Sequence, residues 1–439
     1  MNSAEQAMNP AGRARGHWRK MAPSTGNFQW KVRHTVLAVL FGTSIISFLD
    51  RIAMSVAMPY IAADYHLGPV ETGLVMSIFF AGYSISQVPG GMLADRFGVR
   101  RVATYAMLMW SGFTALTGIV TSVAQMMITR FLFGLGEGVF PSCAFKTVAI
   151  WFPAKERATA NAIRLAASPL GAALAPLVVV AIMSMWGWKA VFLTMFVPGF
   201  LMALLFWLFV ADRPSESALV SRAELAEIEE GGDTPDQGIE EKPSFRTVLC
   251  EPNIFKYFLV IFAYDIAYWG FTTWLPTYLV KVRGFSMVQM GLAASLPFFA
   301  GALGAILGGW ISQRFFRTSR RTPLIIAQIV TAGLLYLIYT VTSLPMLIVC
   351  ETLAGFCLNF FVAAFWALPM NSVPKRLMGI ASGFINMGGQ LAAFISPICI
   401  GYLVGAKGGG FNHAFMFLMA AVFISLLVVT CISSRTREA

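Results

Sequence analysis

The sequence has few charged side chains. Of its 439 residues, only 12% are Asp, Glu, Lys or Arg, whereas a typical soluble domain carries about 25%. A water-facing surface cannot be built from so few charges, so an ordinary soluble enzyme or a soluble binding module is excluded. A hydrophobic content of 57% also excludes a disordered chain.

Residues that bind metals or form disulfide frameworks are also scarce. The six cysteines form no CxxC pair, and the chain contains no HExxH motif and no GxxxxGK[ST] phosphate loop. We therefore expect no metal, no cofactor, no use of ATP and no enzymatic activity. The four histidines lie in the amino-terminal tail or at the ends of apolar runs, at His17, His34, His66 and His413.

Long apolar runs dominate the rest of the chain. A membrane-spanning helix needs about 20 predominantly apolar residues, and twelve runs approach or exceed that length. They predict an all-α integral membrane protein with twelve transmembrane helices. The runs lie at about 36–62, 71–92, 102–123, 126–150, 159–185, 190–211, 253–280, 288–312, 323–342, 344–369, 378–404 and 414–432.

Basic residues gather on one side of these runs. A net charge of +11 in a soluble protein would suggest nucleic acid. Here 24 Lys and Arg residues fall in the tails and alternate loops, and only four fall in the remaining loops. The positive-inside rule then predicts both termini in the cytoplasm, which an even number of spans also requires. We expect a multi-pass protein of the inner (plasma) membrane, in contact with lipid and not with nucleic acid.

The chain is predicted to consist of two similar halves. Gly134 and Gly355 are 221 residues apart, and so are Pro153 and Pro374. Repeated hydropathy around a central polar linker is typical of secondary transporters. We expect two six-helix bundles related by a pseudo-two-fold axis. The predicted parts are a basic cytoplasmic tail at 1–33, bundles at 34–211 and 251–433, a cytoplasmic linker at 212–250 and a tail at 434–439.

The stretch GMLADRFGVRR at 91–101 resembles the loop motif between helices 2 and 3 of the major facilitator superfamily. Its aspartate, Asp95, can accept hydrogen bonds from arginines and cap a neighbouring helix, so the motif predicts a latch for one conformation. The corresponding position in the second half is Gln313, where a weaker latch is expected. The basic members of the latch are Arg96, Arg100 and Arg101.

A narrower resemblance rests on a set of motifs. FLDR at 48–51, RFLFGLGEGVFP at 130–141, WFP at 151–153 and TWLPTYL at 273–279 together resemble the anion:cation symporter family. That family includes bacterial sugar-acid and aromatic-acid carriers and the vesicular glutamate and lysosomal sialic acid transporters. The resemblance implies a monomeric carrier of small organic anions that works by alternating access.

Five charged residues lie deep inside predicted spans, namely Asp50, Arg51, Arg130, Glu137 and Asp265. A charge at the centre of a bilayer costs at least about 2.5–3.5 kcal/mol, so each needs a reason. Arginine stays charged and grips a carboxylate with two hydrogen bonds, which makes Arg51 and Arg130 the predicted substrate clamps. Asp50 and Glu137 are predicted to couple proton binding to transport, in agreement with the resemblance. The alternative is two structural ion pairs.

Polar side chains on other spans are further candidates for substrate binding. Tyr83 and Gln87 lie one turn apart, as do Asn386 and Gln390. Such pairs can bind a hydroxyl or carboxylate group, and the resemblance places Tyr83 toward the substrate. The alternatives are a packing role for the tyrosine and a helix–helix hydrogen bond for the amides.

Aromatic and unexpected charged residues complete the candidates. Tyr268, Trp269 and Trp366 are predicted to face the substrate, with an interfacial aromatic belt as the alternative. Arg164 stands where the sugar-acid carriers have neutral residues, so it is either a third anion contact, a gate paired with an acid, or a snorkelling side chain. Asp265 adds a carboxylate that can pair with Arg164 or Arg51.

These observations predict a proton-coupled symporter for the uptake of an organic anion such as a sugar acid, an aromatic acid or another small carboxylate, with the proton as coupling ion and sodium as its alternative. The rival is an exchanger or facilitator without proton coupling, of the organophosphate/phosphate type. A channel is a third class, which the internal repeat disfavours.

Overall fold

The computed structural model describes residues 30–230, 245–251, 253–316, 319–374, 377–407 and 409–432. Most of the predicted basic tail, residues 231–244 of the predicted linker and the carboxy-terminal tail lie outside the described residues, together with the basic residues they contain.

The described residues form helices and no strand. The first half contains α2 (Val32–Asp64), α3 (Pro69–Phe97), α4 (Val99–Thr117), α5 (Val123–Trp151) and α6 (Ala154–Phe209). Short helices η2 (Pro214–Glu216), α7 (Arg222–Glu230) and α8 (Phe245–Leu249) follow. The second half contains α9 (Ile254–Lys281), α10 (Met287–Phe315), α11 (Thr322–Thr340), α12 (Leu344–Phe365), α13 (Ala367–Ser372), α14 (Met378–Gly405) and α15 (Phe411–Thr430).

Every predicted span corresponds to helix in the structure. The 56 residues of α6 contain two predicted spans, which join at Gly187, where φ is 79° and the helix is interrupted. Glycine adopts a positive φ readily because it has no Cβ. Eight helices of the described residues are long and apolar enough to span a membrane, with α6 counted once and α12–α13 taken together. With α3, α4 and α5, which are more polar, the predicted twelve spans are accounted for.

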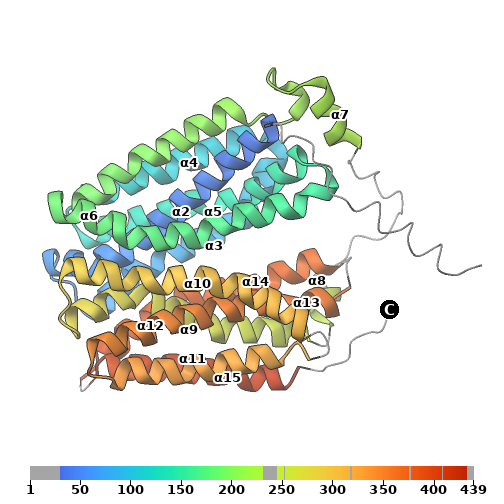
Figure 1. The fold of residues 1–439 in the computed structure, drawn as a ribbon. Coiled ribbons are helices and arrows are strands. Elements are labelled where there is room, and N and C mark those ends of the chain that lie inside the picture. Colours follow the sequence, from blue (N-terminus) through green and yellow to red (C-terminus); the bar gives the residue numbers. More distant parts are fainter. Residues whose placement is uncertain are drawn as a thin grey trace, which may run out of the picture.

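The two halves form two bundles that lie one above the other in Figure 1. Their packing follows the same order: α2 packs on α6 and α3 on α5, and likewise α9 packs on α14 and α10 on α12. Equivalent glycines support this. A Cβ at Gly134 would meet the carbonyl of Phe79, and a Cβ at Gly355 would meet that of Pro297. The predicted internal repeat is confirmed at the level of helix packing.

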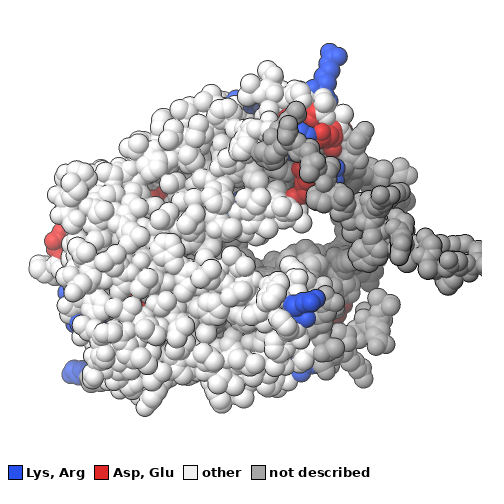
Figure 2. Space-filling model, viewed as in Figure 1, with Lys and Arg blue, Asp and Glu red and all other residues white. Residues whose placement is uncertain are grey.

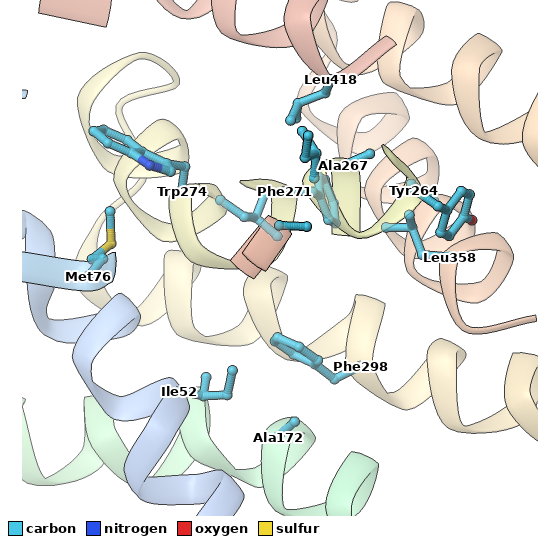
Figure 3. Packing of buried hydrophobic residues seen from close by; sticks show 14 of the residues in the cluster. Ile52, Met76, Ala172, Tyr264, Ala267, Phe271, Trp274, Phe298, Leu358 and Leu418 are labelled. Carbon is cyan, nitrogen blue, oxygen red and sulfur yellow. The ribbon is translucent and has the colours of Figure 1, made fainter. Parts of the chain in front are cut away.

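The two halves pack against each other at one end of the molecule and are separated at the other. The separated end is the one where α7 lies, and we call it the linker end. At the opposite end, a Cβ at Gly73 would meet the backbone of Pro397, and one at Gly291 would touch Val180. One hydrophobic cluster runs through both halves and includes Ile52, Ala172 and Phe298 (Figure 3).

The surface shows a hollow between the bundles that opens toward the linker end (Figure 2). Charged side chains in that view lie mainly near the two ends, and the broad face between them is uncharged. On the uncharged faces Tyr105, Ile306 and Phe423 are each more than half exposed. Apolar exposure on this scale fits a surface in contact with lipid.

The linker helix α7 is attached to the first half by carboxylates. Glu224 accepts hydrogen bonds from the backbone N–H groups of Val32 (3.2 Å) and Arg33 (3.0 Å), so it caps α2. Glu227 pairs with Lys31 at 2.6 Å and with Arg33 at 3.0 Å. Hydrogen bonds from Lys31 and then Arg33 lower the pKa of the Glu227 carboxyl. This contact fixes the start of α2 to the linker.

Candidate functional site

The centre of the site is an ion pair between two helices of the first half. The Nη2 of Arg51 on α2 donates to Oε1 of Glu137 on α5 at 2.5 Å. The hydroxyl of Ser47, one turn before Arg51, donates to the same oxygen at 2.7 Å. Arg51 and Glu137 are 8% and 1% exposed. Charge-assisted bonds of this kind hold an arginine in one orientation.

Asp50 and Arg130 lie beside this pair, and both are buried. Within the part of the chain that the structure describes, neither oxygen of Asp50 has a hydrogen-bond partner. Asp50 interacts electrostatically with Glu137 and Arg130. Unpartnered atoms also include the Nε atoms of Arg51 and Arg130 and Oε2 of Glu137. An unmade buried hydrogen bond costs about 1–3 kcal/mol, so these groups are suited to a proton, a water or a ligand.

Aromatic rings surround the guanidinium of Arg51. Its Cζ lies 4.7 Å from the ring centroid of Phe48, 4.6 Å from that of Tyr83 and 6.0 Å from that of Trp269. Trp269 belongs to the second half and meets Phe80 of the first half edge to face, with centroids 4.8 Å apart. Aromatic faces stabilise a cation where water is excluded. The site therefore lies where the two halves meet.

Little space remains on the side of the arginines away from the linker end. A pocket there is lined by Arg51 and Arg130 together with Trp269 and Thr273 of the second half. Its free volume is about 10 Å³, which is roughly enough for one water molecule. A larger ligand must enter from the hollow at the linker end in this conformation.

Two of the predicted residues of the second half reach the central site: Trp269 lies beside Arg51, and Tyr268 interacts electrostatically with Arg51. Tyr268 donates to Oδ1 of Asn359 on α12 at 3.5 Å. Asp265 lies against Gly389 of α14, and the side-chain oxygen of Gln390 is buried without a partner. Among the described residues Asp265 forms no ion pair, so the predicted pairing with Arg164 or Arg51 is not formed here.

The remaining candidates are half-buried. Gln87, Asn386 and Trp366 are each of intermediate exposure. Gln87 accepts a hydrogen bond from Ser142 at 3.2 Å through its backbone carbonyl, and Trp366 packs edge to face on Phe365. Their roles in binding stay predictions.

Arg164 lies on the same inner face as Arg51. Its side chain is buried, and its guanidinium covers the ring of Phe145 at 4.4 Å. It interacts electrostatically with Tyr83, which also contacts Arg51. The structure thus brings Tyr83 between two of the predicted arginines.

The predicted latch is assembled differently from expectation. Asp95 pairs with Lys146 of α5 at 2.7 Å rather than with an arginine. The backbone N–H of Arg100 donates to Asp212 at 2.8 Å, and its Nε donates to the carbonyl of Trp207 at 2.8 Å. Asp212, not Asp95, therefore caps the start of α4.

The other two latch arginines make weaker contacts. Arg96 covers the ring of Phe97 at 5.2 Å, while Arg101 is exposed. Neither forms an ion pair with Asp95 among the described residues, because Lys146 takes that position.

Three further contributors escaped prediction. Ser47 lies one turn from Arg51 on the same helix face. This spacing could have predicted that both side chains bind the same group, Glu137. Asn359 is a polar residue in an apolar helix, and its Nδ2 donates to the carbonyl of Gly355 at 3.0 Å. Asp212 follows the end of α6, and no sequence pattern links it to the start of α4.

The sequence matches the family model of the Major Facilitator Superfamily over residues 40–397 and 317–438. The chain belongs to this superfamily. The predicted fold of twelve helices in two bundles is thereby confirmed, and the relatives of the chain are transporters and not enzymes.

Individual relatives agree with this assignment. The chain is 31% identical over 404 residues to the probable sulfoacetate transporter SauU of Cupriavidus necator, covering 90% of this chain and 93% of that one. It is 32% identical over 423 residues to the probable galactarate/D-glucarate transporter GudP of Bacillus subtilis, covering 91% and 92%. A solved bacterial homologue of the lysosomal transporter Spinster has the same fold, with a TM-score of 0.74 at 18% identity over 92% of this chain and 96% of that one.

Proposed function

We propose that this transporter is a proton-coupled symporter for the uptake of a small organic acid anion. The observation that carries the proposal is the buried pair of Arg51 and Glu137, 2.5 Å apart between α2 and α5. A pair inside the membrane rarely stabilises a fold more than apolar packing would. The presence of this pair is better explained by a transport cycle in which the pair breaks and re-forms.

Arg51 and Arg130 are the proposed contacts for the substrate carboxylate. Each has a buried Nε without a partner, and both line the small pocket at the meeting point of the halves. Guanidinium groups bind carboxylates and sulfonates with parallel hydrogen bonds. The relatives named for sulfoacetate and for galactarate and D-glucarate carry substrates with such groups.

Glu137 and Asp50 are the proposed proton carriers. Glu137 occupies Arg51, so a substrate carboxylate competes with it for the same guanidinium. Protonation of Glu137 removes its charge and releases Arg51. Asp50 has no hydrogen-bond partner for either oxygen, which suits a carboxyl that carries a proton during part of the cycle.

Charge balance supports coupling. Two arginines and two acids meet at the central site: Arg51, Arg130, Asp50 and Glu137. With all four ionised, their charges sum to zero. A bound anion adds negative charge, and protonation of an acid restores the balance in a medium where net charge is costly.

The proposed cycle follows from these groups. With the site open to the outside, Glu137 and Asp50 take up protons and the arginines bind the anion. The neutralised site then permits the bundles to rock. At the linker end, loss of protons re-forms the pair of Arg51 with Glu137 and expels the anion. We propose that the linker end faces the cytoplasm at a bacterial inner membrane, which the positive-inside bias supports, and we expect a monomer.

Reconstitution into liposomes tests the coupling. With an imposed pH gradient, the unmutated protein should accumulate a labelled sugar acid against its concentration gradient. Glu137→Gln should lose this uphill uptake but keep substrate counterflow, because exchange needs no proton. Glu71→Gln, an exposed residue at the start of α3, is the matched control and should behave like the unmutated protein.

Two results would contradict the proposal. Uphill uptake by Glu137→Gln would remove Glu137 from the coupling. Counterflow without uphill uptake in the unmutated protein would instead favour an exchanger or facilitator.

A further inference from the structure

Arg164 is a buried cation without a counter-ion. Its side chain is 5% exposed, and its Nη2 is buried without a hydrogen-bond partner. Its Nε donates a long hydrogen bond, 3.4 Å, to Oδ1 of Asn161. Among the described residues no carboxylate lies within 4.0 Å of it. An unpaired arginine inside a membrane protein needs a compensating partner.

The backbone position of Arg164 lies well inside the first bundle. Arg164 lies ten residues into α6, roughly 15 Å from the start of the helix. Its guanidinium packs on the ring of Phe145 from α5 and interacts with Tyr83 of α3. The helix α6 packs mainly on α2, α4 and α10, whereas α3 packs mainly on α5 and α14. The side chain of Arg164 therefore extends from α6 toward helices on which α6 itself packs little.

Tyr83 connects Arg164 to the central site. Its ring lies 4.6 Å from the Cζ of Arg51, and the two side chains interact electrostatically. Counted along their own helices from the linker end, Arg164, Tyr83 and Arg51 lie roughly 15, 21 and 29 Å deep. The three residues thus lie at successive depths between the hollow and the ion pair.

We infer that Arg164 is a second acid-binding subsite and that the substrate is a short-chain dianion, a molecule with an acidic group at each end. This inference rests on the proposed carboxylate function. One acid group binds Arg51 and Arg130, and the other binds the free Nη2 of Arg164. Tyr83 lies beside the carbon chain between them. A monocarboxylate fills only the inner subsite and leaves Arg164 unpaired.

A matched pair of ligands tests the subsite. Galactarate carries a carboxylate at both ends, whereas D-galactonate has a hydroxymethyl group in place of one of them. Binding of both is measured by calorimetry with the full-length protein in detergent, and sulfoacetate with acetate serves as a shorter pair. A hydrogen bond to a charged group contributes about 1.5–3 kcal/mol, so galactarate should bind about 10- to 100-fold more tightly than D-galactonate.

Variants assign this preference to Arg164. Arg164→Gln should weaken galactarate binding about 10- to 100-fold and change D-galactonate binding little. Arg164→Lys should retain part of the preference, because it keeps the charge but not the planar fork. Lys155→Gln removes the same charge from an exposed position on the same helix and should leave both affinities unchanged. Thermal unfolding and gel filtration confirm that each variant is folded.

The outcomes separate the two proposals. Equal affinities for both acids in the unmutated protein, or equal losses in Arg164→Gln, would overturn the role of Arg164 and leave the carboxylate function standing. If no acid of either pair binds, the proposed function fails and this inference fails with it.

Discussion

Arg51 and Glu137 form a buried ion pair that joins α2 to α5, with side chains 8% and 1% exposed. In the other four ion pairs of the described residues, at least one side chain is 34% or more exposed. Those pairs lie near water at the linker end, where an ion pair contributes little. The central pair is different because each partner depends on the other for its only strong neutralising contact.

This dependence predicts a non-additive effect on stability. Arg51→Gln should lower the free energy of unfolding by about 3–5 kcal/mol, because it leaves the buried charge of Glu137 without its ion-pair partner. The double variant Arg51→Gln/Glu137→Gln removes both charges and should unfold at a higher temperature than Arg51→Gln alone. Thermal unfolding of the four proteins in one detergent measures the coupling. Additive losses would mean that the pair is not coupled in solution.

Gly134 and Gly355 should be equally intolerant of a side chain. A Cβ at either position overlaps the backbone of the neighbouring helix, at Phe79 or at Pro297. Overpacking of this kind costs about 1–3 kcal/mol. Gly134→Ala and Gly355→Ala should each lower the unfolding temperature, whereas Gly333→Ala, where nothing lies within 4 Å of the Cβ, should not. A marked difference between the two would show that the halves are not packed alike.

Gly73 should control closure at the opposite end. Its Cβ would meet the backbone of Pro397, across the boundary between α3 and α14. The same penalty of about 1–3 kcal/mol then falls on the closed arrangement alone and shifts the equilibrium about 5- to 150-fold toward opening. Gly73→Ala should lengthen the mean distance between spin labels placed at Leu67 and Lys407, in a background without the native cysteines.

The matched control for closure is Gly112→Ala, whose Cβ would meet nothing within 4 Å. An unchanged label distance in Gly73→Ala, in a folded protein, would argue against this contact as part of the closure.

The contact of α7 with α2 should depend weakly on pH. Hydrogen bonds from Lys31 and Arg33 lower the folded-state pKa of Glu227 below its ordinary value of 4.5. The stabilisation is therefore present above pH 4.5 and is lost as the pH falls through the lower, folded-state pKa. Because Glu227 is 43% exposed, it amounts to less than about 1 kcal/mol. Glu227→Gln should slightly lower the unfolding temperature at pH 7, and the difference should vanish toward pH 3.

The sequence by itself determined the spans and the charged residues that lie buried between them. Apolar length marks a membrane helix because the bilayer offers no other solvent, and the cost of a buried charge singles out Arg51 and Glu137 before any contact is known. The spacing of Gly134 and Gly355 revealed the repeat. The spans and the buried charges can be read from the sequence because each depends only on residues near one another in the chain. The repeat can be read because both halves carry matching residues in the same order.

Only the tertiary structure decided which groups meet. Arg130 and Glu137 share a helix face, yet Glu137 pairs with Arg51 of another helix, and Asp95 pairs with Lys146. The side-chain contacts of Arg164 were ambiguous until its guanidinium was placed over the ring of Phe145. Such contacts depend on the rotation and depth of one helix relative to another, which are set by the close packing of whole helices and leave no local pattern in the sequence.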